Sequence, residues 1–105
     1  MMFILLVAST ESSETMQDII GLSLPLSNMG HKVVVFFNEE SVNLLEKRRY
    51  EFSLIPVGIR LKVCRTIAIR KGLTKIEDLI FSAEMSSLGE LVNLLEEADR
   101  TVFLR

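Results

Sequence analysis

The chain has 105 residues, which is the length of one domain, and its 49% hydrophobic and 25% charged residues are enough to bury a core without disulfides or bound metals. Its formal net charge is -2 with acidic and basic residues interspersed, which disfavours a binder of nucleic-acid phosphates or anionic lipids. The single cysteine cannot form an internal disulfide and suits a reducing compartment, so we expect a cytoplasmic protein.

The apolar opening, residues 1–8, is short, has no basic residue ahead of it and runs into a polar segment, so it does not resemble a secretory signal. No stretch approaches the roughly 20 apolar residues that a membrane span needs. Within the opening, residues 3–7 are continuously apolar, which is typical of a strand covered on both faces in a parallel sheet. We therefore expect a central first strand.

A first helix is predicted after the polar residues 9–13, with apolar positions from Met16 to Leu26. Gly21 lowers helix propensity and Pro25 cannot donate a hydrogen bond to the carbonyl of Gly21, so we expect a kink or a break within residues 21–25. Residues 28–31 should end this helix. Residues 32–37 have high β propensity and predict a second buried strand.

Asn38 is placed to cap a second helix, with two glutamates in the first turn, where the helix dipole favours them. The apolar side of this helix would consist of Val42, Leu44 and Leu45, and the charged residues 46–49 would form its solvated end. Residues 50–58 mix aromatic residues with Pro56 and Gly58 and show no period, which predicts a loop.

The only cysteine, Cys64, falls where a strand is predicted to meet a helix. Residues 59–63 alternate apolar and cationic side chains, whereas residues 65–71 favour a helix closed by Gly72. Such a junction directs backbone N–H groups and the positive end of the helix dipole at the sulfur, which favours the thiolate. Arg65, Arg70 and Lys71 add positive charge nearby.

The C-terminal third predicts a short helical turn, a strand, a helix and a last strand. Residues 74–77 and 87–90 both match the capping-box pattern, and the second match precedes a well-spaced apolar helix face made of Leu91, Val92, Leu94, Leu95 and Ala98. The strands are expected at residues 80–85 and 101–104. Strands that alternate with helices predict an α/β fold with a parallel sheet between helices.

Other kinds of site find little support in the sequence. His31 precedes the second strand whereas Cys64 follows the third, so in a parallel sheet they lie at opposite edges, about 15 Å or more apart. This separation disfavours a Cys-His pair and leaves no ligand set for a metal. No glycine-rich loop follows the first strand, so a phosphate-bearing cofactor is not predicted either.

Several residues should share the C-terminal edge of the sheet with Cys64, because each follows or ends a predicted strand. Ligands of open parallel sheets bind at that edge. Helix caps and turns explain most of these side chains without any function. They are Ser9, Thr10, Asn38, Glu84, Met85 and Ser86.

Four stretches of the chain carry a family resemblance: the opening strand and helix, residues 30–37, residues 63–73 around Cys64, and residues 86–103. They resemble the DsrE/DsrF-like sulfur-relay family, and in particular its TusD type of subunit. The resemblance spans residues 1–105 as a single domain. It implies a three-layer α/β/α fold with a five-stranded parallel sheet in the order 4-3-2-1-5, and association into homo- or hetero-oligomers.

The resemblance also implies a function. Cys64 occupies the position of the family's functional cysteine, which accepts sulfane sulfur as a persulfide and passes it to a partner protein in tRNA thiolation or sulfur metabolism. The chain would then be a sulfurtransferase with sulfur donor and acceptor proteins as partners and no cofactor. Such a relay needs a reachable thiolate, and Arg65 is the best candidate to stabilise the anionic sulfur.

Two alternatives stay open at this point. Cys64 could be buried and inert in a non-catalytic assembly or small-ligand-binding module of the same fold, because cysteine is often a small core residue. It could also form an intermolecular disulfide in a redox sensor.

Overall fold

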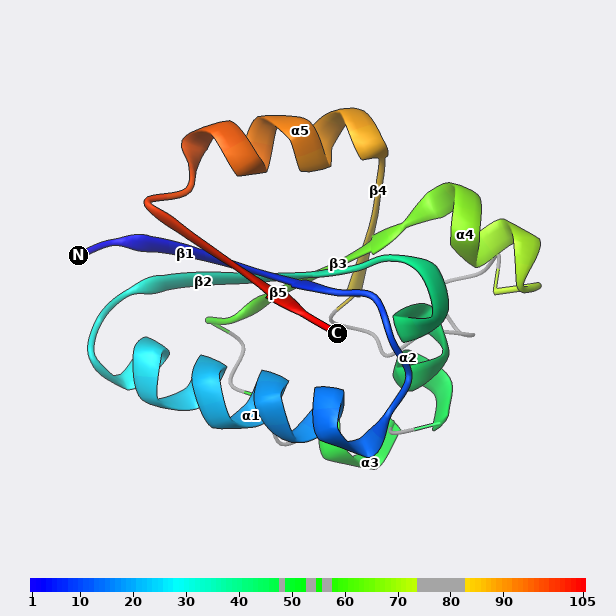
Figure 1. The fold of residues 1–105 in the computed structure, drawn as a ribbon, viewed down its shortest axis with the longest axis horizontal. Coiled ribbons are helices and arrows are strands. Elements are labelled where there is room, and N and C mark those ends of the chain that lie inside the picture. The colour runs from blue at the N-terminus through cyan, green and yellow to red at the C-terminus, as the bar shows by residue number, and fades with distance from the viewer. Residues whose placement is uncertain (48, 53–54, 56–57, 74–82) are drawn as a thin grey trace.

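The computed structural model describes residues 1–47, 49–52, 55, 58–73 and 83–105. Its centre is a sheet of five parallel strands in the order β4-β3-β2-β1-β5 (Figure 1). The expected fold class and strand order are therefore confirmed. The strands are β1 (Phe3–Ala8), β2 (Lys32–Phe37), β3 (Arg60–Cys64), β4 (Ala83–Ser86) and β5 (Arg100–Leu104).

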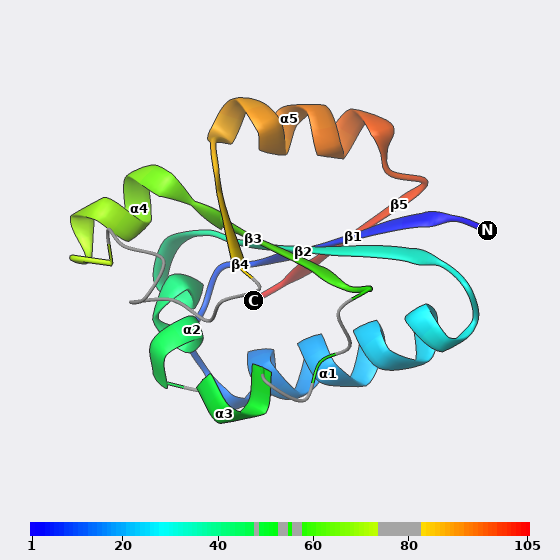
Figure 2. The same ribbon diagram turned by 180° about the vertical axis from the view of Figure 1, so that it is seen from behind.

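Helices lie on both faces of this sheet, as Figures 1 and 2 show. One face carries α1 (Ser13–Asn28), α2 (Leu44–Lys47) and α3 (Arg49–Phe52), and α5 (Leu88–Glu97) crosses the other. The short helix α4 (Arg65–Arg70) follows β3 at the end of the sheet. Within the described residues, no helix is both long and apolar enough to cross a bilayer.

The core is built on β1, β2 and β3, whose neighbouring strands and helical layers exclude water from both faces. Leu5, Leu6, Val35, Phe36 and Phe37 are fully buried. Burial on both faces explains why the first two strands are continuously apolar instead of alternating. Against this sheet the ring of Phe52 makes an edge-on contact with Phe37, with 5.4 Å between the centroids.

The first helix is unbroken, so, of the kink or break predicted near residues 21–25, the break is wrong. The Ser12 side chain accepts a hydrogen bond from the Thr15 N–H at the start, and the helix continues through the exposed Pro25 to Asn28. Its buried face, with Met16, Ile19 and Ser23, packs on the sheet. This packing outweighs the one backbone hydrogen bond that proline removes.

The second helical region is divided into three pieces. The Asn38 side chain accepts a hydrogen bond from the Glu39 N–H at 2.9 Å, as expected of a cap, but the first turn is the 3-10 helix η1 (Glu39–Asn43). The expected loop over residues 50–58 is wrong at its start, because Tyr50 and Phe52 belong to α3 and Phe52 is buried. Burial of this aromatic ring favours helix over loop there.

The C-terminal third begins again at β4, because the helical turn predicted over residues 74–79 and the first part of the next strand lie outside the described residues. The Ser87 side chain caps α5 by accepting a hydrogen bond from the Glu90 N–H at 3.0 Å. Only one side of the predicted apolar face of α5 is covered. Leu94 is buried, whereas Val92 is about half exposed.

Candidate functional site

Cys64 lies at the junction that the sequence predicts. It is the last residue of β3 and the cap residue of α4, and its side chain makes no capping hydrogen bond. Side chains alternate along a strand, so Cys64 shares a face with Lys62, which reaches Glu90 of α5. The thiol therefore lies at the C-terminal edge of the sheet, on the α5 side.

The thiol is not exposed. Cys64 is only 1% accessible, so the expectation of a freely reachable sulfur is wrong for this conformation. The physical reason is its place in an interior strand, where β2 and β4 flank it and Ser86 of β4 is its direct neighbour in the register. A strand-to-helix junction exposes a side chain only if the neighbouring strands leave it uncovered.

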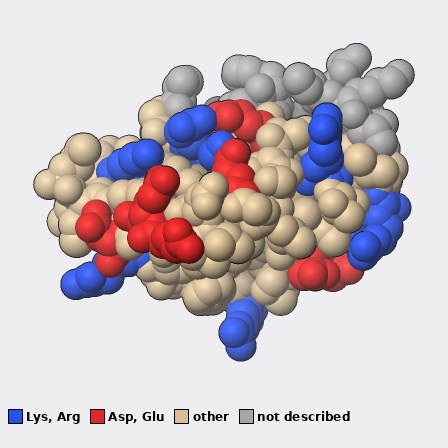
Figure 3. Space-filling model, turned by 90° about the horizontal axis from the view of Figure 1, so that it is seen from above, with Lys and Arg blue, Asp and Glu red and all other residues tan. Residues whose placement is uncertain are grey.

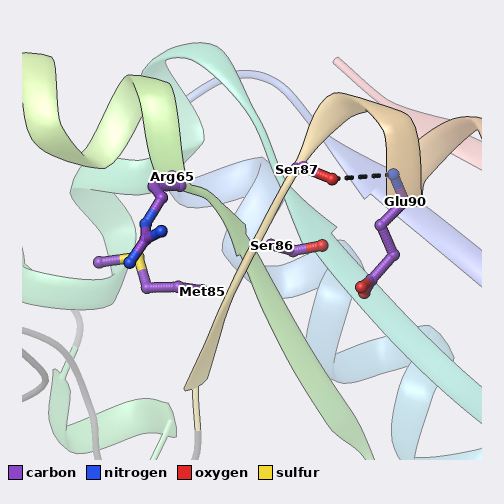
Figure 4. Close-up of a pocket in the computed structure, with 5 residues that line it drawn as sticks. All are labelled: Arg65, Met85, Ser86, Ser87 and Glu90. Carbon is purple, nitrogen blue, oxygen red and sulfur yellow. Dashed lines mark hydrogen bonds between the residues drawn. The ribbon is translucent and has the colours of Figure 1, made fainter.

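A cleft of about 320 Å³ opens beside Cys64. Figure 4 shows Arg65 and Met85 on one side of it and Ser86, Ser87 and Glu90 on the other, and these five residues line it. The cleft reaches Ser86, which pairs with Cys64 across β3 and β4, but Cys64 itself does not line it. It combines residues from the start of α4, the end of β4 and the start of α5.

An ion-pair network with the buried Lys62 at its centre borders the cleft. Lys62 is 7% exposed, and its Nζ lies 2.5 Å from Oε1 of Glu90 and 3.6 Å from Oε2 of Glu84. Arg60 holds both carboxylate oxygens of Glu84 at 3.1 Å. The sequence analysis missed this network, because the alternation of residues 59–63 marks Lys62 only as one cation on the polar side of a strand. No local sequence pattern marks it, because the register of β3 against β4 brings Lys62 opposite Glu84.

These neighbours lower the pKa of Glu90. The hydrogen bond from Lys62 contributes most, followed by the Ser86 hydroxyl, while the charges of Lys62 and Arg60 act in the same direction against the opposing effect of burial. Glu90 is therefore a carboxylate at neutral pH. It places a negative charge on one wall of the cleft.

Ser86 contributes a buried hydroxyl. The residue is 7% exposed, and among the described residues its Oγ has no partner at good hydrogen-bond geometry, although the carboxylate of Glu90 lies near it. Buried hydroxyls without a partner are uncommon, because desolvation is then not compensated. The Ser86 hydroxyl points toward the Glu90 side of the cleft (Figure 4).

Arg65 follows Cys64 in the chain but lies in a different environment. It is exposed and lines the cleft, and it forms no ion pair with any residue that the structure describes. Arg65 and Cys64, the two site residues expected from the sequence, thus lie on either side of the junction. One faces the cleft and the other is buried.

The remaining polar candidates serve structural roles. His31 lies at the opposite edge, where its Nδ1 accepts a hydrogen bond from the Met2 N–H at 3.0 Å. Thr10 hydrogen-bonds to the buried Thr15 hydroxyl at the start of α1, and Asn38 caps η1. No group of three potential metal ligands is present in the described ranges.

A comparison with known proteins identifies the family. The DsrE/DsrF-like family model matches residues 1–104. Among solved structures, the ychN protein from E. coli is similar, with a TM-score of 0.83 and 19% identity over 98% of this chain and 99% of that one. MTH1491 from Methanobacterium thermoautotrophicum, titled a protein of unknown function, has a TM-score of 0.80 and 16% identity with the same coverage.

No curated protein matches the sequence. The two structural likenesses, both below 20% identity, establish the common fold. The match of the family model over nearly the whole length goes further, and the chain belongs to the DsrE/DsrF-like family.

Proposed function

We propose that this protein is a cytoplasmic sulfur carrier that takes up sulfane sulfur as a persulfide on Cys64 and passes it to a partner protein. The observation that supports this proposal is the position of the single cysteine, at the C-terminal edge of a DsrE/DsrF-like sheet and next to a cleft. Ligands of open parallel sheets bind at this edge.

The chemistry needs no cofactor. The Cys64 thiolate attacks the outer sulfur of a donor persulfide, the donor's S–S bond breaks, and its electron pair leaves with the donor thiolate. A thiolate of the acceptor then takes the outer sulfur from Cys64 in the same way. No net oxidation occurs, and the first thiolate is restored.

Exchange at a buried sulfur requires local opening. Cys64 is 1% exposed, so the residues that cover its sulfur have to move before a donor sulfur can reach it. Openings of this kind occur in native proteins at a lower free energy than global unfolding. The proposal therefore predicts slow but measurable thiol reactivity in the native state.

Persulfide loading tests the proposal directly. After incubation with a persulfide donor and gel filtration, intact-protein mass spectrometry should show one added sulfur atom, and Cys64→Ser should remove the adduct. A matched variant, Ser23→Ala, changes a buried hydroxyl of α1, on the face of the sheet opposite α5, and should leave loading intact. A native wild-type protein that stays unmodified would contradict the carrier function.

The burial of Cys64 supports a second candidate function, an assembly or ligand-binding module with an inert cysteine. Alkylation separates the two. A carrier reacts with iodoacetamide under native conditions at a rate that plateaus below that of the unfolded chain, whereas an inert cysteine reacts only once denaturant unfolds the protein.

We further propose that the carrier works as an oligomer with sulfur donor and acceptor proteins as its partners. The exposed apolar residues of α5, Leu88, Val92 and Leu95, support this. They follow one another at spacings of four and three residues and therefore form one stripe along the helix. Apolar stripes of this kind are typical of protein interfaces.

A further inference from the structure

The cleft beside Cys64 presents two opposite charges that do not neutralise each other. Arg65 lies on one side and Glu90 on the other, and no ion pair joins them. Glu90 is held by Lys62, whereas Arg65 has no charged partner among the described residues. A molecule that carries a carboxylate at one end and an ammonium group at the other would match both walls.

The cleft also offers uncharged contacts of two kinds. The Ser86 hydroxyl is more than nine-tenths buried and has no hydrogen bond of good geometry to a described residue, although the Glu90 carboxylate lies near it, so it can exchange a hydrogen bond with a polar ligand. Met85 adds a polarizable thioether to the opposite side. A volume of about 320 Å³ is at the small end of ligand sites and suits a molecule of amino-acid size.

The balance of charge favours a ligand with a net negative charge. Lys62 offsets Glu90 and Arg60 offsets Glu84, so Arg65 leaves the described surroundings of the cleft with one uncompensated positive charge. An amino acid whose side chain ends in an ionised persulfide has one carboxylate, one ammonium group and one negative sulfur. Its charges therefore complement those of the cleft.

We propose that the cleft binds a small amino-acid persulfide as a further sulfur donor beside donor proteins, with its carboxylate on Arg65 and its ammonium group on Glu90. This inference rests on the proposed function of Cys64. The register of Ser86 beside Cys64 brings the bound donor next to the strand that holds the thiol. The Cys64 thiolate attacks the outer sulfur of the donor, the donor's S–S bond breaks, and the free amino-acid thiolate leaves with the electron pair.

Binding is tested without reaction, with S-methyl-L-cysteine as the probe. In ¹⁵N-labelled Cys64→Ser protein, the amide signals of Ser86, Ser87 and Glu90 should shift saturably, and Arg65→Gln should weaken binding about tenfold or more. Arg70→Gln is the matched control, because Arg70 is an exposed arginine of the same helix that does not line the cleft. The probe 3-(methylthio)propanoate lacks the ammonium group and should bind more weakly. Absent binding, or equal binding by Arg65→Gln, overturns the assignment.

Kinetics separates this inference from the proposed function. Cysteine persulfide has both a carboxylate and an ammonium group, whereas inorganic polysulfide, although anionic, has neither. Arg65→Gln should slow loading of Cys64 from cysteine persulfide about tenfold more than it slows loading from polysulfide. If both donors load the wild type but Arg65→Gln changes the two loading rates by the same factor, the cleft is not the donor site. If neither donor loads the wild type, the carrier function fails, and the titration alone decides what the cleft binds.

Discussion

Lys62 and Glu90 form the closest ion pair at the site, and their environments differ. The side chain of Lys62 is 9% exposed and that of Glu90 is 41% exposed. Water therefore stabilises the lysine charge less than the glutamate charge, and the lysine charge depends more on the ion pair. A buried ammonium group without a counter-charge is strongly unfavourable. The pair therefore joins the first turn of α5 to β3 and shapes one wall of the cleft.

Glu90→Gln should lower the free energy of unfolding by about 1–2 kcal/mol at neutral pH, because an amide replaces a charged hydrogen-bond partner of Lys62. The pKa of Glu90 is lowered from 4.5, so its contribution is fully present above that pH and is lost as the pH falls through the folded-state pKa. Urea denaturation should therefore show that the free energies of unfolding of the wild type and the variant become equal in acid.

The matched control for this change is Glu97→Gln. Glu97 is exposed in the last turn of the same helix and forms no ion pair with a described residue, so its loss should cost little at any pH. A difference between wild type and Glu90→Gln that did not shrink in acid would show that the carboxylate charge is not what stabilises Lys62.

Helix α1 tolerates a proline because its packing compensates for the missing hydrogen bond. Pro25 is exposed and lies in the last turns, so it leaves the carbonyl of Gly21 without a backbone donor. The end of the helix is closed independently, since the Met29 N–H donates to the carbonyl of Pro25 at 3.0 Å and Gly30 has a φ of +87°. The helix thus continues beyond its weakest position.

Pro25→Ala should raise the free energy of unfolding by about 1–2 kcal/mol, because alanine restores the hydrogen bond to Gly21 and only part of this gain is offset by greater freedom of the unfolded chain. Thermal unfolding followed by circular dichroism measures the change. Gly21→Ala provides a comparison in the same helix, since its added methyl group meets no atom within 4 Å. We expect it to raise the free energy of unfolding by about 0.5–1 kcal/mol. Destabilisation by Pro25→Ala would mean that the proline ring itself supports the packing.

At the scale of the whole molecule, the two faces of the sheet are covered unequally. Three helices lie on one face, whereas α5 alone crosses the other in the described part of the chain (Figures 1 and 2). Seen from the α5 side, charged side chains leave a broad uncharged area (Figure 3). Phe103 of β5 lies in register with Val7, Phe36 and Lys62, so it is on the same face of the sheet as α5, which Lys62 contacts. Phe103 is 55% exposed. An oligomer would remove this apolar surface from water.

Val92→Glu should therefore reduce self-association, because it places a charge at the centre of the exposed stripe of α5. Size-exclusion chromatography with light scattering should show a smaller mass than for the wild type at equal concentration. The control is Asn93→Glu, which adds the same charge at an exposed position one residue along the helix, outside the stripe. An unchanged mass for Val92→Glu would exclude this stripe as the interface.

Local patterns accounted for most of the elements and part of the site. The continuous apolar runs of β1 and β2, the caps at Asn38 and Ser87 and the position of Cys64 all depend on residues close together in the chain. The prediction of a loop at the start of residues 50–58 was wrong because the structure there depends on a contact between residues far apart in the chain. The helix at Phe52 is favoured by burial against Phe37, a contact that no local pattern reveals.

The sequence by itself determined the α/β class and the strand-to-helix junction at Cys64, because periodicity, capping and backbone propensity act over a few residues. Only the tertiary structure decided that Cys64 is buried, that Lys62 pairs with Glu90 and that Arg65 faces a cleft. Burial and ion pairing depend on which strands and helices lie side by side. That is set by the packing of the whole chain around its sheet.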